Sequence, residues 1–323
     1  MVIYMYHIIV NPASRSGRGK KYWKMLQPIL DERNISYQVY ITTHQGHTTE
    51  ITKELSSVVK GTDEFIHIII LGGDGTINEA LQGITCFENV ILSYIPTGSS
   101  NDFARDLGIS KDPVTALNRI LSCPPEKKID LGLIHFENSL VRDGQMDIPD
   151  RYFAVSCGIG YDAAICKEAM ASPVKNFLNR CGLGKLTYVA IALKQLVSTE
   201  YITGELTLDD NDSIIPLQKL LFIAGMNHKY EGGGFQFAPD ACDTDGKLNL
   251  CVITRIAKPK IPFILPSGYK GTHYRFDGID AYQASSYTVR TSSPLWVHTD
   301  GEVRTKADFI FVKCEPAKLR FIY

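Results

Sequence analysis

The sequence lacks long apolar runs, closely paired cysteines and a surplus of either charge. No apolar stretch approaches the ~20 residues that a membrane span needs, and the N-terminal MVIYMYHIIVNP has neither the basic region nor the small-residue cleavage site of a signal peptide. Its eight cysteines include no C-x-x-C pair, which argues against a zinc site or a redox dithiol and favours a reducing compartment. With 34 basic and 35 acidic side chains the net charge is −1, so nucleic acid is not an expected partner. We therefore expect a cytoplasmic protein without a transmembrane segment, which can still lie peripherally at the inner membrane face.

The chain of 323 residues exceeds one average domain, so two domains are the expected organisation. The first 129 residues alternate four times between apolar strand patterns, such as FIHIIIL, and segments with apolar residues at helical spacing. Such alternation predicts a parallel sheet with right-handed crossovers, whose ligands bind beyond the carboxyl ends of the strands. We predict a doubly wound, Rossmann-like α/β domain over residues 1–129, to which residues 306–323 return.

After residue 129 the pattern changes to short strand-like segments separated by glycine, aspartate, asparagine and proline turns. The segments RYFAVSCGIG, YRFDGIDAYQ, SYTVR and LWVHTD are each expected to form one strand. A helical stretch from about Ala163 to Thr199, with a break near Gly182, interrupts them. Over residues 130–305 we therefore predict an antiparallel β-sandwich domain with a helical insertion.

Three turns rich in glycine or serine follow strands of the first domain: NPASRSGRGK at Asn11–Lys20, GGDGT at Gly72–Thr76 and PTGSSND at Pro96–Asp102. Glycine lets backbone N–H groups approach phosphate oxygens closely, and the helix after each turn adds partial positive charge. Because the turns follow strands of one parallel sheet, we expect them to line one site. No turn completes the P-loop pattern or G-x-G-x-x-G, so the predicted nucleotide site is of another type.

Asp74 lies in the middle of the second turn. A bare carboxylate beside a polyphosphate repels it unless Mg²⁺ lies between them or nearby. Asp102 ends the third turn with a second acid, for which helix capping is a rival interpretation. A glycine turn that serves only strand-to-helix packing is the alternative for GGDGT alone. The three turns together favour a magnesium–nucleotide site in which Asp74 organises the metal.

The segment LWVHTDGEVR places Asp300 and Glu302 two residues apart. If the strand continues through them, both side chains project to one face, whereas a TDGE hairpin turn would spoil that geometry. Phosphoryl transfer needs an acceptor for the proton of the attacking hydroxyl, and Glu302 is a candidate for it.

Another acidic segment, FAPDACDTDGKLNL, holds Asp240, Asp243 and Asp245 before Gly246. These oxygens suit a hard cation held in a loop, although the spacing is not that of an EF-hand. Solvated turn aspartates are the alternative interpretation.

Five separated motifs occur in a fixed order: NPASRSGRG, LGGDGTINEAL, PTGSSNDFARDLG, GGGFQFAPDA with TDGKL, and TDGE. In this order they resemble the diacylglycerol kinase catalytic-domain family, which includes bacterial lipid kinases and the sphingosine and ceramide kinases. The resemblance extends over nearly the whole chain. It implies ATP-dependent phosphorylation of a lipid hydroxyl, with diacylglycerol giving phosphatidic acid as the first expectation. It also implies ATP and Mg²⁺ as cofactors, a nucleotide-binding α/β domain and a β-rich domain that accepts the lipid.

Site residues are assigned where this sequence matches the motifs of the family. Glu302 matches the family's general base, Asp300 would support it, and Asp74 would organise Mg²⁺ and the phosphates. The nucleotide contacts assigned by the resemblance and the three turns are Asn11, Ala13, Ser14, Arg15, Thr42, Gly72, Gly73, Gly75, Thr76, Asn78, Glu79, Thr97, Gly98, Ser99, Asn101 and Asp102.

The resemblance also implies a second, structural Mg²⁺ site in the β-rich domain. The Asp245 carboxylate and the backbone carbonyls of Cys242 and Lys247 would be its ligands. This site would be separate from the metal that Asp74 organises.

The sequence departs from the family pattern at three places. The first loop, NPASRSGRG, is two residues longer than the common form N-P-x-S-G-x-G, which leaves the phosphate-binding cation open among Arg15, Arg18 and Lys20. Ser99 replaces the usual threonine and keeps the hydroxyl. Tyr161 replaces the usual phenylalanine.

Two alternatives to a lipid kinase are a kinase related to NAD kinase, which shares GGDGT, and a nucleotide-sensing protein without turnover. The lipid substrate would be presented at a membrane surface, and an apolar stripe could reach it: Leu186, Val189, Leu193 and Leu196, flanked by Lys185 and Lys194. Packing of this stripe on the sandwich is the alternative. Edge strands in the second domain would permit a homodimer.

Overall fold

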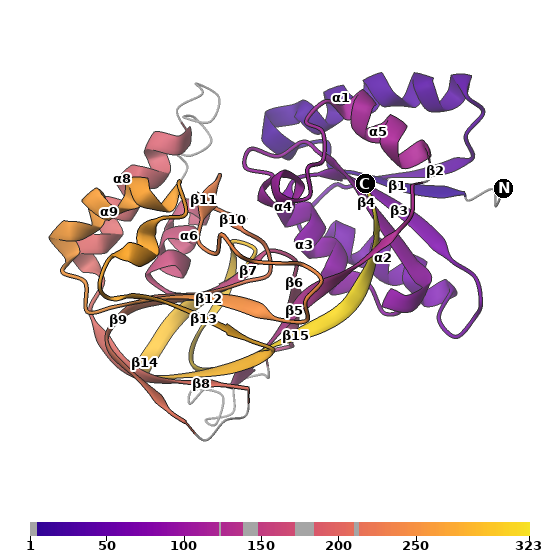
Figure 1. Cartoon of the computed structure of the whole chain (residues 1–323). Coiled ribbons are helices and arrows are strands. Elements are labelled where there is room, and N and C mark those ends of the chain that lie inside the picture. The colour runs from indigo at the N-terminus through magenta and orange to yellow at the C-terminus, as the bar shows by residue number, and fades with distance from the viewer. Residues whose placement is uncertain (1–4, 123, 138–147, 172–183, 210–212) are drawn as a thin grey trace. The chain divides into compact units, whose positions relative to one another are not determined.

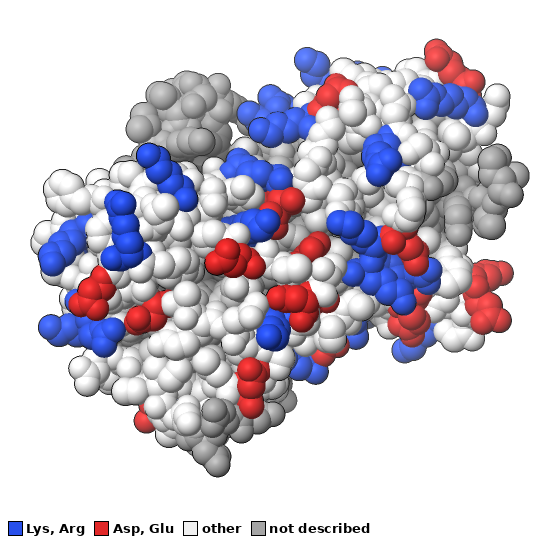
Figure 2. Space-filling view, in the orientation of Figure 1, with Lys and Arg blue, Asp and Glu red and all other residues white. Residues whose placement is uncertain are grey.

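The computed structural model describes residues 5–122, 124–137, 148–171, 184–209 and 213–323, and for residues 137, 171 and 184–190 it describes the backbone alone. The chain forms two compact units (Figure 1). Unit 1 comprises Met1–Leu131 with Pro316–Tyr323, and unit 2 comprises Gly132–Glu315. Within the described residues, no helix combines the length and the apolar character that crossing a bilayer requires. Acidic and basic side chains are interspersed on the face drawn in Figure 2, in keeping with the net charge of −1.

Unit 1 is built on a parallel sheet whose strands are apolar on both faces. In β3, the run Ile68–Leu71 is fully buried, which is the pattern of a parallel strand covered by helices on both sides. The elements of unit 1 are β1 (Tyr6–Val10), α1 (Ser14–Glu32), β2 (Tyr37–Ile41), α2 (His47–Val58), β3 (Ile66–Gly72), α3 (Asp74–Gly83), η1 (Phe87–Asn89), β4 (Val90–Pro96), α4 (Asp102–Asp106) and α5 (Pro113–Leu121).

The strand order in unit 1 brings the ends of three strands together. The sheet runs β2-β1-β3-β4 with all pairs parallel, and Val10 lies opposite Leu71, which lies opposite Ile95. Helices α1 and α5 cover one face and α2 and α3 the other (Figure 1). Because the strands end at the same edge, the turns after β1, β3 and β4 lie beside one another.

The end of the chain belongs to unit 1. Strand β15 (Glu302–Ile322) pairs in parallel with β4 through Arg320–Ile322. Arg320 holds both carboxylate oxygens of Glu126, with Nη2 to Oε1 at 2.7 Å, and the Asp130 carboxylate accepts the N–H of Ala317 at 2.7 Å. These bonds tie residues 316–323 to the sheet of the N-terminal segment.

Unit 2 is rich in antiparallel strands. Its elements are β5 (Lys127–Glu137), which begins in unit 1, β6 (Arg151–Phe153), β7 (Ser156–Gly160), α6 (Tyr161–Ala171), α8 (Gly184–Ser198), β8 (Ile202–Leu208), β9 (Ile215–Met226), β10 (Tyr230–Glu231), β11 (Phe235–Gln236), β12 (Leu248–Thr254), η3 (Lys258–Lys260), α9 (Ile261–Gly268), η4 (His273–Arg275), β13 (Ile279–Ala284), β14 (Ser286–Thr299) and the first part of β15. The mixed α/β architecture with a large β-rich C-terminal part, predicted from the sequence, is confirmed.

The sheet of unit 2 curves around one core. Its order is β13-β12-β9-β7-β14-β15, with β5 and β6 beyond β15. Strands β7 and β8 share one position in the sheet, one beyond the end of the other, because each pairs with both β9 and β14. Leu250 of β12 and Ile134 of β5 belong to the same buried cluster although their strands are far apart in the order, so the sheet bends over its own apolar face.

Three predictions of strand continuity are wrong. RYFAVSCGIG is divided into β6 and β7, because the intervening backbone N–H groups of Ala154 and Val155 bind the side chain of Asp300 in place of a neighbouring strand. The first residues of YRFDGIDAYQ form η4 before β13. SYTVR and LWVHTD belong to a single strand, β14, whose register shifts between Arg290 and Leu295 around Pro294, which has no N–H for the ladder. The helical insertion is present as α6 and α8, and the break predicted near Gly182 lies outside the described residues.

Candidate functional site

The first turn of unit 1 is hydrogen-bonded to the other two. The Asn11 side-chain amide donates to Oγ1 of Thr76 at 3.1 Å, and the hydroxyls of Ser14 and Thr97 are 2.6 Å apart. The chain can turn sharply here because Arg15 and the two residues after it have positive φ, within the first turn of α1. These bonds make one surface of three segments that are up to 83 residues apart in the sequence.

Glycine is required where the second and third turns meet. A Cβ added to Gly98 would lie 2.9 Å from Cα of Gly73, and one added to Gly72 would lie 2.5 Å from the Thr76 side chain. Gly72 and Gly98 are buried in this contact, whereas Gly73, Asp74 and Gly75 at the start of α3 are half-buried. A helix start with accessible N–H groups attracts phosphate oxygens.

Asp74 and Asp102 lie together at this surface. The backbone N–H of Asp102 donates to Oδ2 of Asp74 at 3.1 Å. Beneath them, the buried Tyr94 hydroxyl donates to Oδ1 of Asn101 at 3.2 Å. Burial, and then the negative charges of Asp74 and Asp102, hold the pKa of Tyr94 well above its usual value. Two neighbouring carboxylates are oxygen ligands of the kind Mg²⁺ prefers, so the residues fit that ion.

The capping interpretation of Asp102 is wrong. Asn101 stands at the cap position of α4 with φ of 49°, and no side-chain cap bond is made there. Asp102 is instead the first residue of the helix, with Nη1 of Arg105 at 3.5 Å from its Oδ1.

The remaining nucleotide candidates have distinct local roles. Oε1 of Glu79 accepts the N–H of Gly46 at 2.9 Å and so joins α3 to the turn before α2. The N–H of Thr42 donates to the carbonyl of Val10 at 2.9 Å, which continues the β1–β2 pairing. By burial the other candidates divide as follows: Asn78 is buried in α3, Gly75 is half-buried, and Ala13, Arg15 and Ser99 are exposed.

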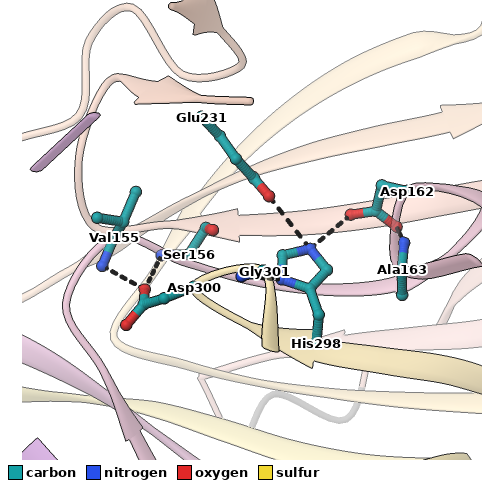
Figure 3. Close-up of polar contacts among 8 residues, drawn as sticks. All are labelled: Val155, Ser156, Asp162, Ala163, Glu231, His298, Asp300 and Gly301. Atoms are coloured by element: carbon teal, nitrogen blue, oxygen red, sulfur yellow. Dashed lines mark hydrogen bonds and ion pairs between the residues drawn. The ribbon is translucent and has the colours of Figure 1, made fainter. Parts of the chain in front are cut away.

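In unit 2, Asp300 and Gly301 form the hairpin turn between β14 and β15. Thr299 pairs with Glu302 across the turn, and both turn residues have positive φ, at 51° and 80°. Of the two alternatives for this segment, a continuing strand and a TDGE hairpin turn, the structure has the turn. Asp300 is fixed by three backbone N–H groups, those of Ala154, Val155 and Ser156, at 3.0, 2.8 and 3.1 Å. Figure 3 shows the bonds from Val155 and Ser156.

His298 lies two residues before Asp300, and its ring lies between two carboxylates. Its buried Nε2 is 3.1 Å from Oδ2 of Asp162 and 3.2 Å from Oε1 of Glu231, and its Nδ1 is 3.2 Å from the N–H of Gly301 (Figure 3). Burial lowers the pKa of His298, but the charges of Glu231 and Asp162 outweigh it and raise the pKa to about 9. The carboxylates therefore favour the protonated ring, and they do so against the N–H of Gly301, which points at Nδ1 and is accepted only when that nitrogen carries no proton.

The same ring belongs to the one group of potential metal ligands found among the described His, Cys, Asp and Glu side chains. Cys166, Glu231 and His298 offer atoms that lie within 4.8 Å of one another. Nε2 already faces two carboxylate oxygens, and a proton on this nitrogen can be shared with both. The contacts therefore favour a proton between His298 and the carboxylates over a metal ion.

The predicted structural metal loop lies in unit 2. Oδ1 of Asp245 accepts the N–H of Lys247 at 3.0 Å, and Oδ2 accepts from the Gln283 side chain at 3.1 Å. Cys242 is exposed, and its thiol is 3.4 Å from the hydroxyl of Thr244. The Asp245 carboxylate thus sits in a turn stabilised by its own hydrogen bonds.

Sequence reasoning missed His298, Glu231 and Tyr94. His298 precedes the TDGE motif directly, which was the available signal, but Asp162 and Glu231 come from segments with no spacing rule that links them to it. Tyr161, the departure in GIGYDA, donates its hydroxyl to the carbonyl of Ala192 at 2.6 Å, so the added oxygen connects α6 to α8.

Comparisons with known proteins give consistent matches. Residues 5–134 match the family model of the diacylglycerol kinase catalytic domain, and residues 155–323 match that of the YegS C-terminal NAD kinase beta sandwich-like domain. The Bacillus subtilis strain 168 protein named "Putative lipid kinase YtlR" is 26% identical over 315 residues, covering 98% of each chain. The "Diacylglycerol kinase" of Mycobacterium tuberculosis strain H37Rv is 27% identical over 249 residues, 76% of this chain and 72% of that protein. A crystal structure from Bacillus anthracis strain Sterne has a TM-score of 0.74 at 23% identity, covers 99% of this chain and 95% of that one, and shows the shared fold.

Proposed function

Since the chain belongs to the diacylglycerol kinase catalytic-domain family, we propose that it transfers the γ-phosphate of ATP to a lipid hydroxyl. Diacylglycerol, which would give phosphatidic acid, is the substrate we favour, because several relatives carry that name. The observation that supports the proposal most is the surface of unit 1 in which three turns are hydrogen-bonded to one another around Asp74 and Asp102. We further propose that the enzyme works in the cytoplasm and meets its lipid at a membrane surface.

In this proposal the three turns bind the nucleotide. The half-buried backbone at Gly73 and Gly75 would donate to phosphate oxygens, and the Asn11 and Ser14 side chains would fix the first turn against the other two. Asp74, with Asp102 beside it, would hold Mg²⁺, which neutralises the charge of the transferring phosphoryl group when it is bound. Positioning and charge compensation supply most of the catalysis in such reactions.

Glu302 is the proposed acceptor of the lipid hydroxyl's proton. Asp300 is less suited to that task, because its two oxygens already accept three backbone N–H bonds, which hold the carboxylate in place. We assign Asp300 the role of holding the turn so that Glu302 is correctly placed. The Asp245 turn, with the carbonyls of Cys242 and Lys247, is retained as a proposed structural Mg²⁺ site.

The experiment that tests the proposal supplies γ-labelled ATP and Mg²⁺ with diacylglycerol in mixed micelles. Label extracted into chloroform supports lipid phosphorylation. Glu302→Gln should lower kcat by at least about a hundredfold while ATP still binds, because the proton acceptor is removed and the phosphate surface is not. Glu205→Gln, an exposed glutamate of β8 in the same unit, is the matched control and should keep full activity.

A second acceptor belongs in the same assay. The family model that matches residues 155–323 is described as NAD kinase-like, so NAD⁺ is the competitor that the comparison itself suggests. Label that stays in the aqueous phase as NADP⁺ would replace the lipid proposal. ATP binding without phosphorylation of either acceptor or of a total lipid extract would instead favour a nucleotide-sensing protein.

A further inference from the structure

The outward face of α9 in unit 2 is apolar. Its exposed positions are Pro262, Phe263 and Pro266, followed by Tyr269 just beyond the last turn. The spacing of i, i+1, i+4 and i+7 places them on one side of the helix. Phe263 is 83% exposed and Tyr269 is 47% exposed. The solvent face of a short surface helix is normally polar, so this apolar face needs a partner.

The face is held rigidly from behind. Ile261, Ser267 and Gly268 are buried on the inner side of α9, and a Cβ on Gly268 would lie 1.8 Å from the ring of Phe235. The Phe235 and Tyr269 rings pack at 5.2 Å between centroids. Exposure of Phe263 is therefore a property of the packed helix, since the opposite side of α9 is fully engaged.

The apolar face has a cationic rim. Residues 255–276 contain five basic side chains and no acidic one, in a chain whose net charge is −1. Lys260 and Lys270 are exposed at the two ends of α9, and Lys258 donates to the carbonyls of Thr199 and Val197 at the end of α8. Figure 2 shows Lys and Arg side chains, interleaved with uncharged surface, over the end of unit 2 that carries α8 and α9.

We propose that this face, Pro262, Phe263, Pro266 and Tyr269 with Lys260 and Lys270, rests on an anionic lipid surface. Aromatic and apolar side chains insert at the headgroup boundary while flanking lysines bind anionic headgroups, which matches the arrangement here. A second copy of the chain is a poor occupant, because a two-fold contact through this face would bring Lys260 and Lys270 of the two copies together. The inference deepens the proposed function, on which it rests only for the expectation that the substrate lies in a membrane.

The stripe predicted on α8 is not this surface. Leu196 is buried, and Leu193 is 42% exposed, so the described part of the stripe is divided between core and surface. The side chains of Leu186 and Val189 lie outside the described residues. The docking face therefore lies on α9, where neither motif nor periodicity suggested it.

The test is vesicle flotation without nucleotide and without diacylglycerol. Wild-type protein should float with vesicles of 70% phosphatidylcholine and 30% phosphatidylglycerol at low salt, and much less with phosphatidylcholine alone. Phe263→Ser should weaken binding about ten- to a hundredfold, the range expected when one phenylalanine side chain is withheld from an apolar phase. The pair Lys260→Glu and Lys270→Glu should weaken it at least about tenfold, and this effect should diminish in 0.5 M salt.

Unit 1 offers a matched control of the same chemistry. Val58 of α2 is 71% exposed, and Lys53 and Lys60 nearby in the sequence are exposed too. Val58→Ser, and Lys53→Glu with Lys60→Glu, should leave flotation unchanged. Equal losses from the unit 1 and unit 2 variants would overturn the proposal, and so would undiminished binding by Phe263→Ser.

Two further measurements separate the docking surface from the proposed reaction and from self-association. If wild-type protein phosphorylates lipid in micelles and Phe263→Ser is slow only on vesicles, both proposals stand. Vesicle binding that depends on Phe263 without any kinase activity would keep the docking surface and overturn the reaction. Light scattering that shows a dimer which Phe263→Ser converts to monomer would assign the face to a second copy and overturn the lipid assignment.

Discussion

Replacement of His298 by glutamine should remove a large pH dependence from the stability of unit 2. Glutamine is neutral at every pH and of similar length, and its amide can still donate to Asp162 or Glu231. The variant therefore removes the proton that His298 holds between these two carboxylates without leaving the site empty. The measured quantity is the free energy of unfolding as a function of pH.

The magnitude follows from the buried ring. The pKa of His298 is raised to about 9, from a value of 6.5 in the unfolded chain. The folded protein therefore keeps a proton that the unfolded chain loses above pH 6.5, so this contribution to stability is complete below 6.5 and is lost as the pH rises through 9. A shift of this size corresponds to at most about 3 kcal/mol. The bond that the neutral ring can accept from Gly301 returns about 1 kcal/mol of it at alkaline pH.

The assay is urea unfolding between pH 6 and 10, followed by tryptophan fluorescence. The chain has two tryptophans, Trp23 in α1 and Trp296 in β14, so a Trp23→Phe background reports on unit 2 alone. Across this range, wild-type stability should fall by about 2 kcal/mol more than that of His298→Gln. His135→Gln, which removes an exposed histidine 2.6 Å from Asp150, is the control and should follow wild type. Parallel curves for wild type and His298→Gln would refute the assignment of a cationic, carboxylate-bound ring.

Three further substitutions probe the two units. Gly158→Ala should destabilise unit 2 by about 1–3 kcal/mol in urea unfolding, because its Cβ would lie 2.3 Å from Nε2 of His298; an unchanged midpoint would contradict this packing. Asp74→Asn should lower kcat/KM for lipid phosphorylation by about a hundredfold or more, and normal magnesium-dependent kinetics would argue against its role. Ser14→Ala, which loses the bond to Thr97, should raise KM for ATP about fivefold with little change in kcat; a fall in kcat alone would place Ser14 in the chemical step.

The proximity of the three turns could be predicted because it follows from local rules. Continuous apolar runs such as β3 predict parallel strands, and parallel strands of one sheet end at the same edge. The residues after those ends, Asn11, Asp74 and Thr97, then have to be neighbours whatever the details of the loops. The individual hydrogen-bond partners could not be predicted in this way, because the contact of the Asp102 backbone with Asp74 depends on the left-handed conformation of Asn101.

The His298 cluster could not be predicted for the opposite reason. His298 and Asp162 are 136 residues apart, and each is a single polar residue in an otherwise apolar segment. Their contact depends on the pairing of β14 with β7, in which His298 lies opposite Gly158, a residue small enough to leave room for both side chains. Neither periodicity nor motif spacing contains the register of two distant antiparallel strands. The same applies to Asp300, whose three N–H donors come from the gap between β6 and β7.

The α9 face shows a different limit of sequence patterns. The letters IPFILPSG are those of a buried segment, and apolar periodicity says which residues share a side of a helix but not which side meets the core. In this fold the choice is made by Gly268, because the absence of a side chain lets the Phe235 ring pack against the backbone at that position. Contact on that side turns Phe263 outward, toward the lysines at both ends of the helix. If Gly268 is replaced by a larger residue, α9 must move away from Phe235. Gly268→Val should therefore weaken vesicle binding, even though it adds apolar surface. A gain in binding would show that apolar area alone, without this orientation, determines docking.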